Sequence, residues 1–117
     1  VLIKENHIRA AGSITKAVQL VRAAQPEKPI EVEVTSFFEV KEALACEVER
    51  IMFDNMSIED MILALEMVNG KCQTEASGNM NLHRVQKVAQ IGVDFISVGA
   101  LTHSAPVADF SLLFKKR

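Results

Sequence analysis

Short apolar runs that end in a polar residue or a glycine recur along the 117-residue chain, and this repetition constrains its fold most strongly. The expected strand ends are Lys4, Glu33, Asp54, Ser77 and Gly99, which are separated by 29, 21, 23 and 22 residues. Such a spacing is the length of one strand, one helix and their connecting turns. The repeat predicts an α/β fold of consecutive βα units, either a doubly wound sheet or a barrel. Five strands are too few to close an eight-stranded barrel.

The expected helices alternate with these strands and begin at residues that favour helix N-termini. Ser13, Thr35 or Ser36, and Ser57 each precede an apolar pattern with a helical period. We expect strands at 1–4, 30–34, 50–53, 72–76 and 95–98, the last of them buried. We expect helices at 14–24, after residue 36, after residue 57, at 82–90 and at 109–114, and a loop at 5–7.

Composition narrows the classes of function. A net charge of −2 argues against nucleic acid or an anionic membrane as a partner. The sequence contains no apolar run long enough to cross a bilayer. Cys46 and Cys72 form no CxxC motif, which is typical of thiols in a reducing cytosol, so we expect a cytoplasmic location. The chain starts in a strand-like run without Met, and we expect it to be a piece of a longer chain.

The first three strand ends carry residues that suit an acidic substrate and a metal. In parallel α/β folds, ligands bind at the carboxyl ends of the strands. Glu33 and Asp54 end successive strands and could hold Mg²⁺ directly or through its waters. Lys4 offers a positive charge to an acidic substrate. On the pattern alone, these residues could instead be solvated at the rim of the sheet.

Two small-residue turns at the later strand ends suggest a phosphate site. Ser77–Gly78 and Gly99 could present backbone N–H groups to an anion. A glycine there lets a ligand approach the backbone closely. The polar run Thr102–Ser104 could donate further hydrogen bonds. The alternative is an ordinary turn between a strand and a helix.

Six segments of the chain together match one known family. They are IKENHI (3–8), AGSI (11–14), IEVEV (30–34), IMFDNM (51–56), EASGN (75–79) and GVDFISVGALTHSAPVADFSL (92–112). In this order they resemble the carboxyl-terminal part of quinolinate phosphoribosyltransferase, the decarboxylating enzyme that makes nicotinate mononucleotide. The resemblance covers nearly the whole chain. ModD-type proteins of molybdenum utilisation share the barrel, but the VGALTHS run argues for the quinolinate enzyme.

The resemblance implies a fold and a reaction. Residues 1–117 would form the carboxyl-terminal part of an incompletely closed, TIM-barrel-like α/β catalytic domain, without its amino-terminal domain and first barrel strands. The implied reaction joins quinolinate to phosphoribosyl pyrophosphate with Mg²⁺, releasing pyrophosphate and carbon dioxide, in NAD biosynthesis. The full enzyme would be a homodimer or a higher homo-oligomer. The alternative is a non-catalytic phosphate-binding module or a ModD-like barrel fragment.

The resemblance also assigns roles to residues at the first three strand ends. Lys4 would bind quinolinate. Glu33 and Asp54 would serve the ribose and the Mg²⁺–pyrophosphate, as catalytic and metal-binding residues. A carboxylate near an oxocarbenium-like ribose, and a metal on the leaving pyrophosphate, suit this chemistry. His7 matches the histidine that follows the family's Lys-x-Asn motif, where it would either contact the substrate or shape the loop.

The later strand ends would hold the substrate's 5′-phosphate. By the same resemblance, Ser77, Gly78 and Gly99 would bind it, with His103 nearby. Asn79 stands where many relatives have a second glycine, and asparagine tolerates left-handed backbone geometry.

The family binds its dicarboxylate substrate with clustered arginines that lie upstream and on a partner subunit. None of the five arginines here ends an expected strand, and Arg50 begins one. Arg22 and Arg84 have the spacing of solvated helix positions. The chain would therefore carry the ribose-phosphate and metal half of a site, and we expect it to be inactive when isolated.

Overall fold

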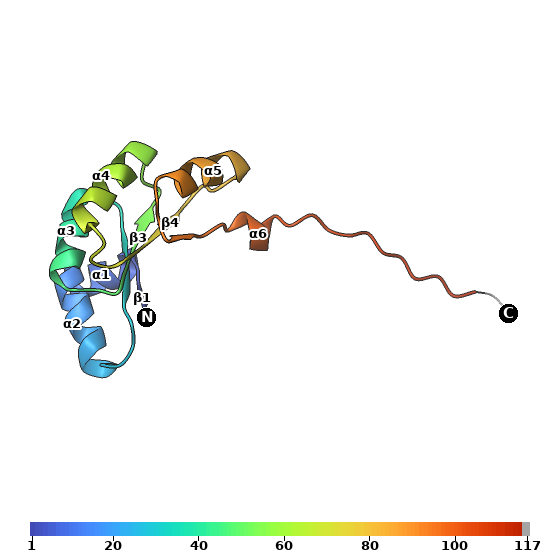
Figure 1. The fold of residues 1–117 in the computed structure, drawn as a ribbon. Helices are drawn as coiled ribbons and strands as arrows, with labels where there is room; N and C mark the ends of the chain where they lie inside the picture. The colour runs from blue at the N-terminus through green and yellow to red at the C-terminus, as the bar shows by residue number, and fades with distance from the viewer. Residues whose placement is uncertain (116–117) are drawn as a thin grey trace.

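The computed structural model describes residues 1–115, which form a five-stranded parallel sheet with intervening helices (Figure 1). The strands are β1 (Leu2–Ile3), β2 (Glu31–Val34), β3 (Arg50–Asp54), β4 (Gln73–Ser77) and β5 (Phe95–Ile96). The helices are α1 (Glu5–Ala11), α2 (Ile14–Ala24), α3 (Phe37–Ala45), α4 (Ile58–Val68), α5 (Leu82–Gln90) and α6 (Ala100–His103). The strands lie side by side in chain order, and every neighbouring pair is parallel. The predicted α/β class and its open, incompletely closed sheet are confirmed.

Side-chain caps set the starts of the longer helices. A serine hydroxyl or an asparagine carboxamide accepts a hydrogen bond from the backbone N–H three residues later, which satisfies a donor that the helix leaves unpaired. The four caps are Ser13 with Lys16, Ser36 with Glu39, Ser57 with Asp60, and Asn81 with Arg84. The predicted helices at 14–24 and 82–90 are confirmed to the residue.

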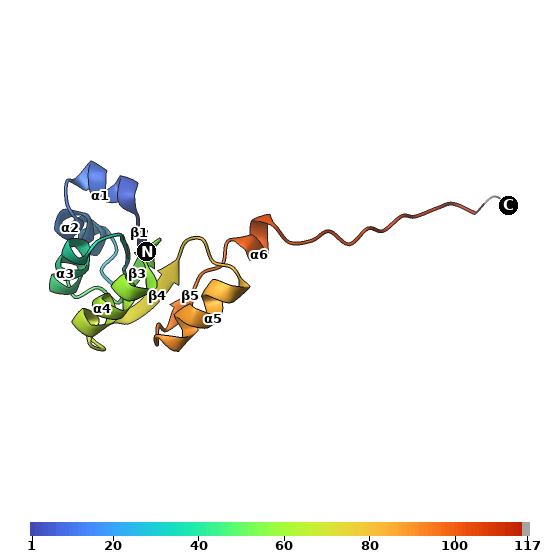
Figure 2. The same ribbon diagram turned by 90° about the horizontal axis from the view of Figure 1, so that it is seen from above.

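The helices cover one face of the sheet (Figure 2). The hydrophobic core lies between these helices and that face. Alternate strand residues point to this face, and Ile3, Val32, Val34, Ile51 and Phe53 are each exposed by no more than 1%. Burial of such apolar side chains stabilises a fold by roughly 1.5–3 kcal/mol each. None of the helices in the described part of the chain is long and apolar enough to cross a membrane.

The other face of the sheet is polar. The register pairs Glu31 with Arg50 and Arg50 with Gln73, so these three side chains point to the same side. Glu33, Met52 and Glu75 form the next row of the same face. This face carries the charged residues, and its carboxyl-terminal edge holds the predicted site.

Three predicted elements differ in the structure. Residues 5–7 begin helix α1, where we expected a loop, because the ring of His7 accepts a hydrogen bond from the backbone N–H of Lys4 and stabilises the first turn. Strand β5 covers only Phe95–Ile96, and Phe95 is 40% exposed. The prediction of a buried strand there was wrong, because β5 is the last strand of the sheet and pairs only with β4.

The predicted helix at 109–114 was also wrong. Residues 105–115 form no helix or strand and run away from the sheet as an extended segment (Figure 1). Phe110, Leu112 and Phe114 are each more than 85% exposed. A helix of about two turns is unstable in water without packing, and the apolar side chains of this segment stay exposed rather than packed on the described chain.

Candidate functional site

Lys4 and Glu33 form an ion pair at the carboxyl-terminal edge of the polar face. Lys4 follows β1 directly and takes the N-terminal position of α1, while Glu33 lies near the end of β2. The Lys4 Nζ atom is 3.3 Å from Glu33 Oε2, and the lysine is half-exposed, whereas the glutamate is largely buried. The structure therefore brings together two of the predicted site residues.

Asp54 lies on the same face as Glu33, one pleat further toward the carboxyl end. Glu33 pairs with Met52 in the register, and Asp54 is the second residue after Met52. Two residues along a strand span about 6.6 Å. Asp54 Oδ2 accepts a hydrogen bond of 3.0 Å from Asn55 Nδ2. The two acids thus come from neighbouring parallel strands, as the sequence predicted.

A cavity of about 510 Å³ lies beside Asp54, between the turns that follow β4 and β5. Its lining comprises Ser77, Gly78, Asn79, Met80, Asn81, Ser97, Gly99, Ala100 and His103. The register sets Asp54 opposite Ser77, so this cavity begins on the strand next to the acid. All four predicted phosphate-binding residues therefore share one cavity, which also receives the N-terminal end of α5.

The two predicted glycine turns differ in geometry. Gly78 has a φ of +90°, which favours glycine, and Asn79 follows at +50°. Gly99 has a φ of −59° and occupies the position before helix α6, so its backbone needs no glycine. A Cβ atom on Gly99 would come within 3.4 Å of the His103 ring. At Gly99 the glycine keeps space in front of His103, whereas at Gly78 it permits the turn itself.

His103 and His7 have different surroundings. His103 lines the cavity, and its Nδ1 atom lies 2.6 Å from Ser104 Oγ, which leaves Nε2 on the side of Gly99. His7 accepts the backbone N–H of Lys4 through Nδ1 at 3.0 Å and lines an apolar cavity beside β1. In this structure the contact of His7 shapes the chain around Lys4, which is one of the two roles considered for it.

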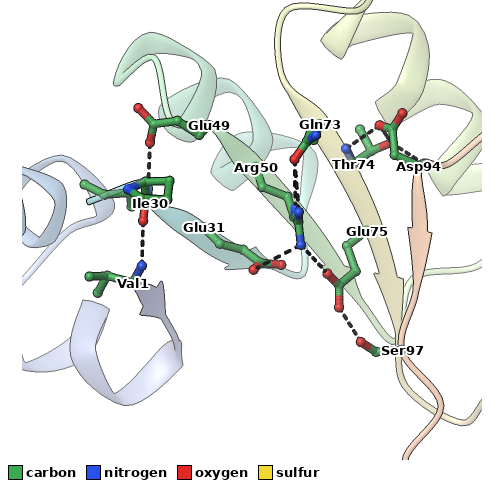
Figure 3. Close-up of polar contacts among 11 residues, drawn as sticks. Val1, Ile30, Glu31, Glu49, Arg50, Gln73, Thr74, Glu75, Asp94 and Ser97 are labelled. Carbon is green, nitrogen blue, oxygen red and sulfur yellow. Dashed lines mark hydrogen bonds and ion pairs between the residues drawn. The ribbon is translucent and has the colours of Figure 1, made fainter. Parts of the chain in front are cut away.

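Arg50 organises a charged cluster that the sequence analysis missed (Figure 3). Its guanidinium lies 3.2 Å from Glu75 Oε2, 3.8 Å from Glu31 Oε2 and 3.0 Å from Gln73 Oε1. It also lies 3.9 Å from the centre of the Phe95 ring, a cation–π contact. The signal in the sequence is that Glu31 and Arg50 each stand near the start of consecutive strands, because parallel pairing then places the two side chains next to each other on one face.

Glu31 is held in this cluster at an energetic cost. Burial, together with repulsion from the Glu75 carboxylate, raises the pKa of Glu31 above its ordinary value, and Arg50 opposes the shift. One oxygen of Glu31 is buried with no hydrogen-bond partner among the described residues. Glu75 Oε1 also accepts a hydrogen bond from the Ser97 hydroxyl. The cluster lies near the amino ends of the strands, away from Asp54, and joins β2, β3 and β4.

We predicted that Arg22 and Arg84 are solvated helix residues, and this prediction was wrong. Both guanidinium groups donate hydrogen bonds to backbone carbonyls. Arg84 Nη2 donates a hydrogen bond of 2.7 Å to the carbonyl of Met56, in the turn after β3. Arg22 Nη2 donates to the carbonyl of Glu47 at 2.8 Å. Each guanidinium ties a helix to a turn near β3, which a helical period alone does not reveal.

The two carboxylates at the carboxyl-terminal edge have the oxygen-donor chemistry that magnesium prefers. The described residues contain no cluster of three His, Cys, Asp or Glu side chains. Mg²⁺ in phosphate-binding enzymes needs only one or two carboxylates, because substrate oxygens and water complete its shell. Lys4 contacts Oε2 of Glu33 and Asn55 contacts Oδ2 of Asp54, so the second oxygen of each acid is the one placed to serve as a ligand.

Comparison with known proteins gives a consistent set of relatives. Residues 1–113 match the family model described as quinolinate phosphoribosyl transferase, C-terminal domain. A probable carboxylating nicotinate-nucleotide pyrophosphorylase of Synechocystis sp. is 46% identical over 116 residues, which cover 96% of this chain and 39% of that protein. The chloroplastic nicotinate-nucleotide pyrophosphorylase of Arabidopsis thaliana is 44% identical over 131 residues, covering 96% of this chain and 38% of that protein.

Solved structures agree with these relatives. The crystal structure of NadC from Streptococcus pyogenes matches with a TM-score of 0.88 and 41% identity, covering 95% of this chain and 39% of that chain. The chain therefore spans about two fifths of the length of the proteins it matches. These matches favour the transferase interpretation over a non-catalytic or ModD-like barrel fragment.

Proposed function

The chain belongs to the quinolinate phosphoribosyl transferase family, and from this premise we propose that it carries the ribose-phosphate and magnesium half of a phosphoribosyl-transfer site. The proposed substrates are quinolinate and phosphoribosyl pyrophosphate, and the proposed products are nicotinate mononucleotide, pyrophosphate and carbon dioxide. The observation that carries the proposal is the shared cavity of Ser77, Gly78, Gly99 and His103 beside Asp54.

The cavity suits the 5′-phosphate of the sugar. The Ser77 hydroxyl, the backbone N–H groups of the two turns and the His103 ring can all donate hydrogen bonds to phosphate oxygens. Asn81 caps α5 at the cavity wall, and the positive end of a helix dipole favours an anion there. With its 5′-phosphate bound in the cavity, the substrate would place its ribose near Asp54 and Glu33.

The two acids act on the ribose and the leaving group. When bound, Mg²⁺ would neutralise charge on the departing pyrophosphate, with Asp54 and Glu33 as its protein ligands, directly or through water. A carboxylate beside the ribose also stabilises the positive charge that develops on the sugar carbon. Lys4 sits 3.3 Å from Glu33, where a cation can contact a carboxylate of the acidic substrate and keep it next to the ribose.

The other expectations for the full enzyme belong to the same proposal. A dicarboxylate requires more cationic donors than Lys4 alone, and arginine forks from elsewhere in a complete assembly would supply them. We extend to that assembly the homodimer or higher homo-oligomer and the cytoplasmic location that the sequence analysis predicted.

Calorimetric titration of the chain with phosphoribosyl pyrophosphate in the presence of Mg²⁺ tests the proposal. Ser77→Ala should weaken binding by roughly tenfold, because it removes one hydrogen bond to a charged group. Ser111→Ala, the same change in the exposed terminal segment, should leave binding unchanged. Equal affinities of wild type and Ser77→Ala, or an anion that shifts NMR signals away from the cavity, would contradict the proposed phosphate site.

A further inference from the structure

A chain of side-chain hydrogen bonds connects Asp54 to the turn after β4. Asn79 Nδ2 donates to Asn55 Oδ1 at 3.0 Å, and Asn55 Nδ2 donates to Asp54 Oδ2 at 3.0 Å. The backbone N–H of Asn55 donates to the carbonyl of Ser77, also at 3.0 Å. Both carboxamides donate through Nδ2 in the direction of the acid, and Asn55 accepts through Oδ1 on its other side, so the chain of donors runs from the turn to Asp54.

The backbone at these positions is specialised for this contact. Asn55 and Asn79 have φ values of +55° and +50°, in the left-handed region where asparagine is one of few tolerated residues. The left-handed turn at Asn55 ends β3 and points its carboxamide across to the neighbouring strand end. These two side chains meet although 24 residues separate them.

Gly78 completes the arrangement by lacking a side chain. A Cβ atom on Gly78 would lie 2.2 Å from Asn55 Oδ1 and 2.4 Å from Asn55 Cγ, which is closer than atoms can approach. The space above Gly78 is therefore filled by the carboxamide of Asn55. The phosphate turn and the side chain that holds Asp54 are packed directly against each other.

We propose that Asn55 and Asn79 are positioning residues, which orient the Asp54 carboxylate from the phosphate-binding turn and so couple the phosphate and cation halves of the site. The proposal rests on the proposed function, because that function makes Asp54 a ligand for the cation. An anion bound at the Gly78–Asn79 turn would restrict the movement of that turn. The hydrogen bonds from Asn79 to Asn55 and from Asn55 to Asp54 would then restrict the Asp54 carboxylate as well. Such coupling between two sites acts equally in both directions.

Glycine substitutions separate this role from a purely structural one. Asn55→Gly and Asn79→Gly each remove one carboxamide and leave the left-handed backbone free of strain. Asn69→Gly is the matched control, since Asn69 has a φ of +45° but ends helix α4, outside the lining of the cavity. Thermal unfolding and an amide NMR spectrum would verify that each variant is folded.

Two measurements on the chain report on Asp54. Three-bond NMR couplings give the χ1 rotamer of Asp54 without any ligand, and paramagnetic broadening by Mn²⁺, with and without inorganic phosphate, reports cation binding near it. We expect one rotamer in wild type and Asn69→Gly, and rotamer averaging in Asn79→Gly and Asn55→Gly. We also expect both of these variants to need about fivefold more Mn²⁺ for equal broadening, a difference of about 1 kcal/mol.

The outcomes decide the two proposals separately. An unchanged Asp54 rotamer in a folded Asn79→Gly chain would overturn the positioning role, even if phosphate and Mn²⁺ bind as expected. Failure of wild type to bind either probe at these residues would overturn the proposed function, while the rotamer measurement would still decide the positioning role. If Asn55→Gly does not fold, Asn79→Gly carries the test alone.

Discussion

The ammonium group of Lys4 lies 3.3 Å from the carboxylate of Glu33, across the first two strands of the sheet. This pair joins the residue proposed to hold the acidic substrate with one proposed to serve the metal. Because the lysine is half-exposed, the ion pair adds little to the stability of the fold. Its main effect is to place a positive charge beside Glu33 at the edge of the sheet.

Replacement of Lys4 by methionine tests this separation of roles. Lys4→Met should change the free energy of unfolding by only about 1 kcal/mol, because water screens the half-exposed lysine end of the pair. In an active assembly with a polypeptide that carries the upstream region of a family member, it should reduce kcat/KM for quinolinate by roughly 10- to 100-fold, the equivalent of one charge-assisted hydrogen bond. Lys28→Met, in the exposed loop before β2, is the control. A normal kcat/KM in Lys4→Met would remove Lys4 from the site.

The charged cluster around Arg50 predicts a pH dependence of stability. Burial and the nearby Glu75 raise the pKa of Glu31 in the folded state above its unfolded value. The contribution of Glu31 to stability is therefore fully present below the unfolded pKa and is lost as pH rises through the folded pKa. Glu31→Gln cannot ionise, so this variant should be more stable than wild type at neutral pH.

Urea unfolding at a series of pH values from about 4 upward measures this effect, because the curves begin to separate at the unfolded pKa of Glu31 and stop separating above its raised folded pKa. The difference between Glu31→Gln and wild type should grow with pH across that window and then become constant. The exposed Glu27→Gln serves as the control for the substitution itself. A variant that is less stable than wild type at neutral pH would show that the ion pair with Arg50 outweighs burial.

Gly99 offers a way to disturb the phosphate cavity without disturbing the sheet. Its φ of −59° accepts any residue, but a side chain there meets the His103 ring. Gly99→Val should therefore leave the fold intact and weaken the binding of phosphoribosyl pyrophosphate, as calorimetric titration would measure. Gly92→Val is not a suitable control because Gly92 has a φ of +89°. Ala100→Val, which changes a different cavity residue, distinguishes loss of volume from contact with His103.

The 117-residue chain alone should not convert quinolinate. The predicted quinolinate contact on this edge of the sheet is Lys4, and a dicarboxylate needs several charge-assisted contacts, each worth about 1.5–3 kcal/mol. An assay of nicotinate mononucleotide formation should show no turnover until a polypeptide with the upstream region of a family member is added. Asp54→Ala should abolish the restored activity. Turnover by the chain alone would contradict the prediction that quinolinate binding needs cationic groups from outside this chain.

Local chemistry was sufficient to predict the four longer helices and the approximate positions of the strands. Ser13, Ser36, Ser57 and Asn81 cap helices through hydrogen bonds to residues three positions away, so the sequence nearby contains the whole interaction. The apolar period of each strand and the repeat of about 22 residues then predict a parallel sheet. For the same reason, Glu33 and Asp54 could be expected on neighbouring strands, since both end strands that are consecutive in the chain.

The tertiary structure decided which of these residues touch. Arg84 meets Met56, and Arg50 meets Glu75, through contacts between residues more than 20 positions apart, which depend on the register of the strands and the packing of the helices. A one-residue change of register would turn each side chain to the other face. The helix predicted at 109–114 shows the converse, because these residues stay exposed in the fold and no packing stabilises a helix there. The sequence by itself thus determined the longer helices, the repeated strands and the edge that carries the site, whereas long-range packing determined the contacts of Asp54, Asn55 and Asn79.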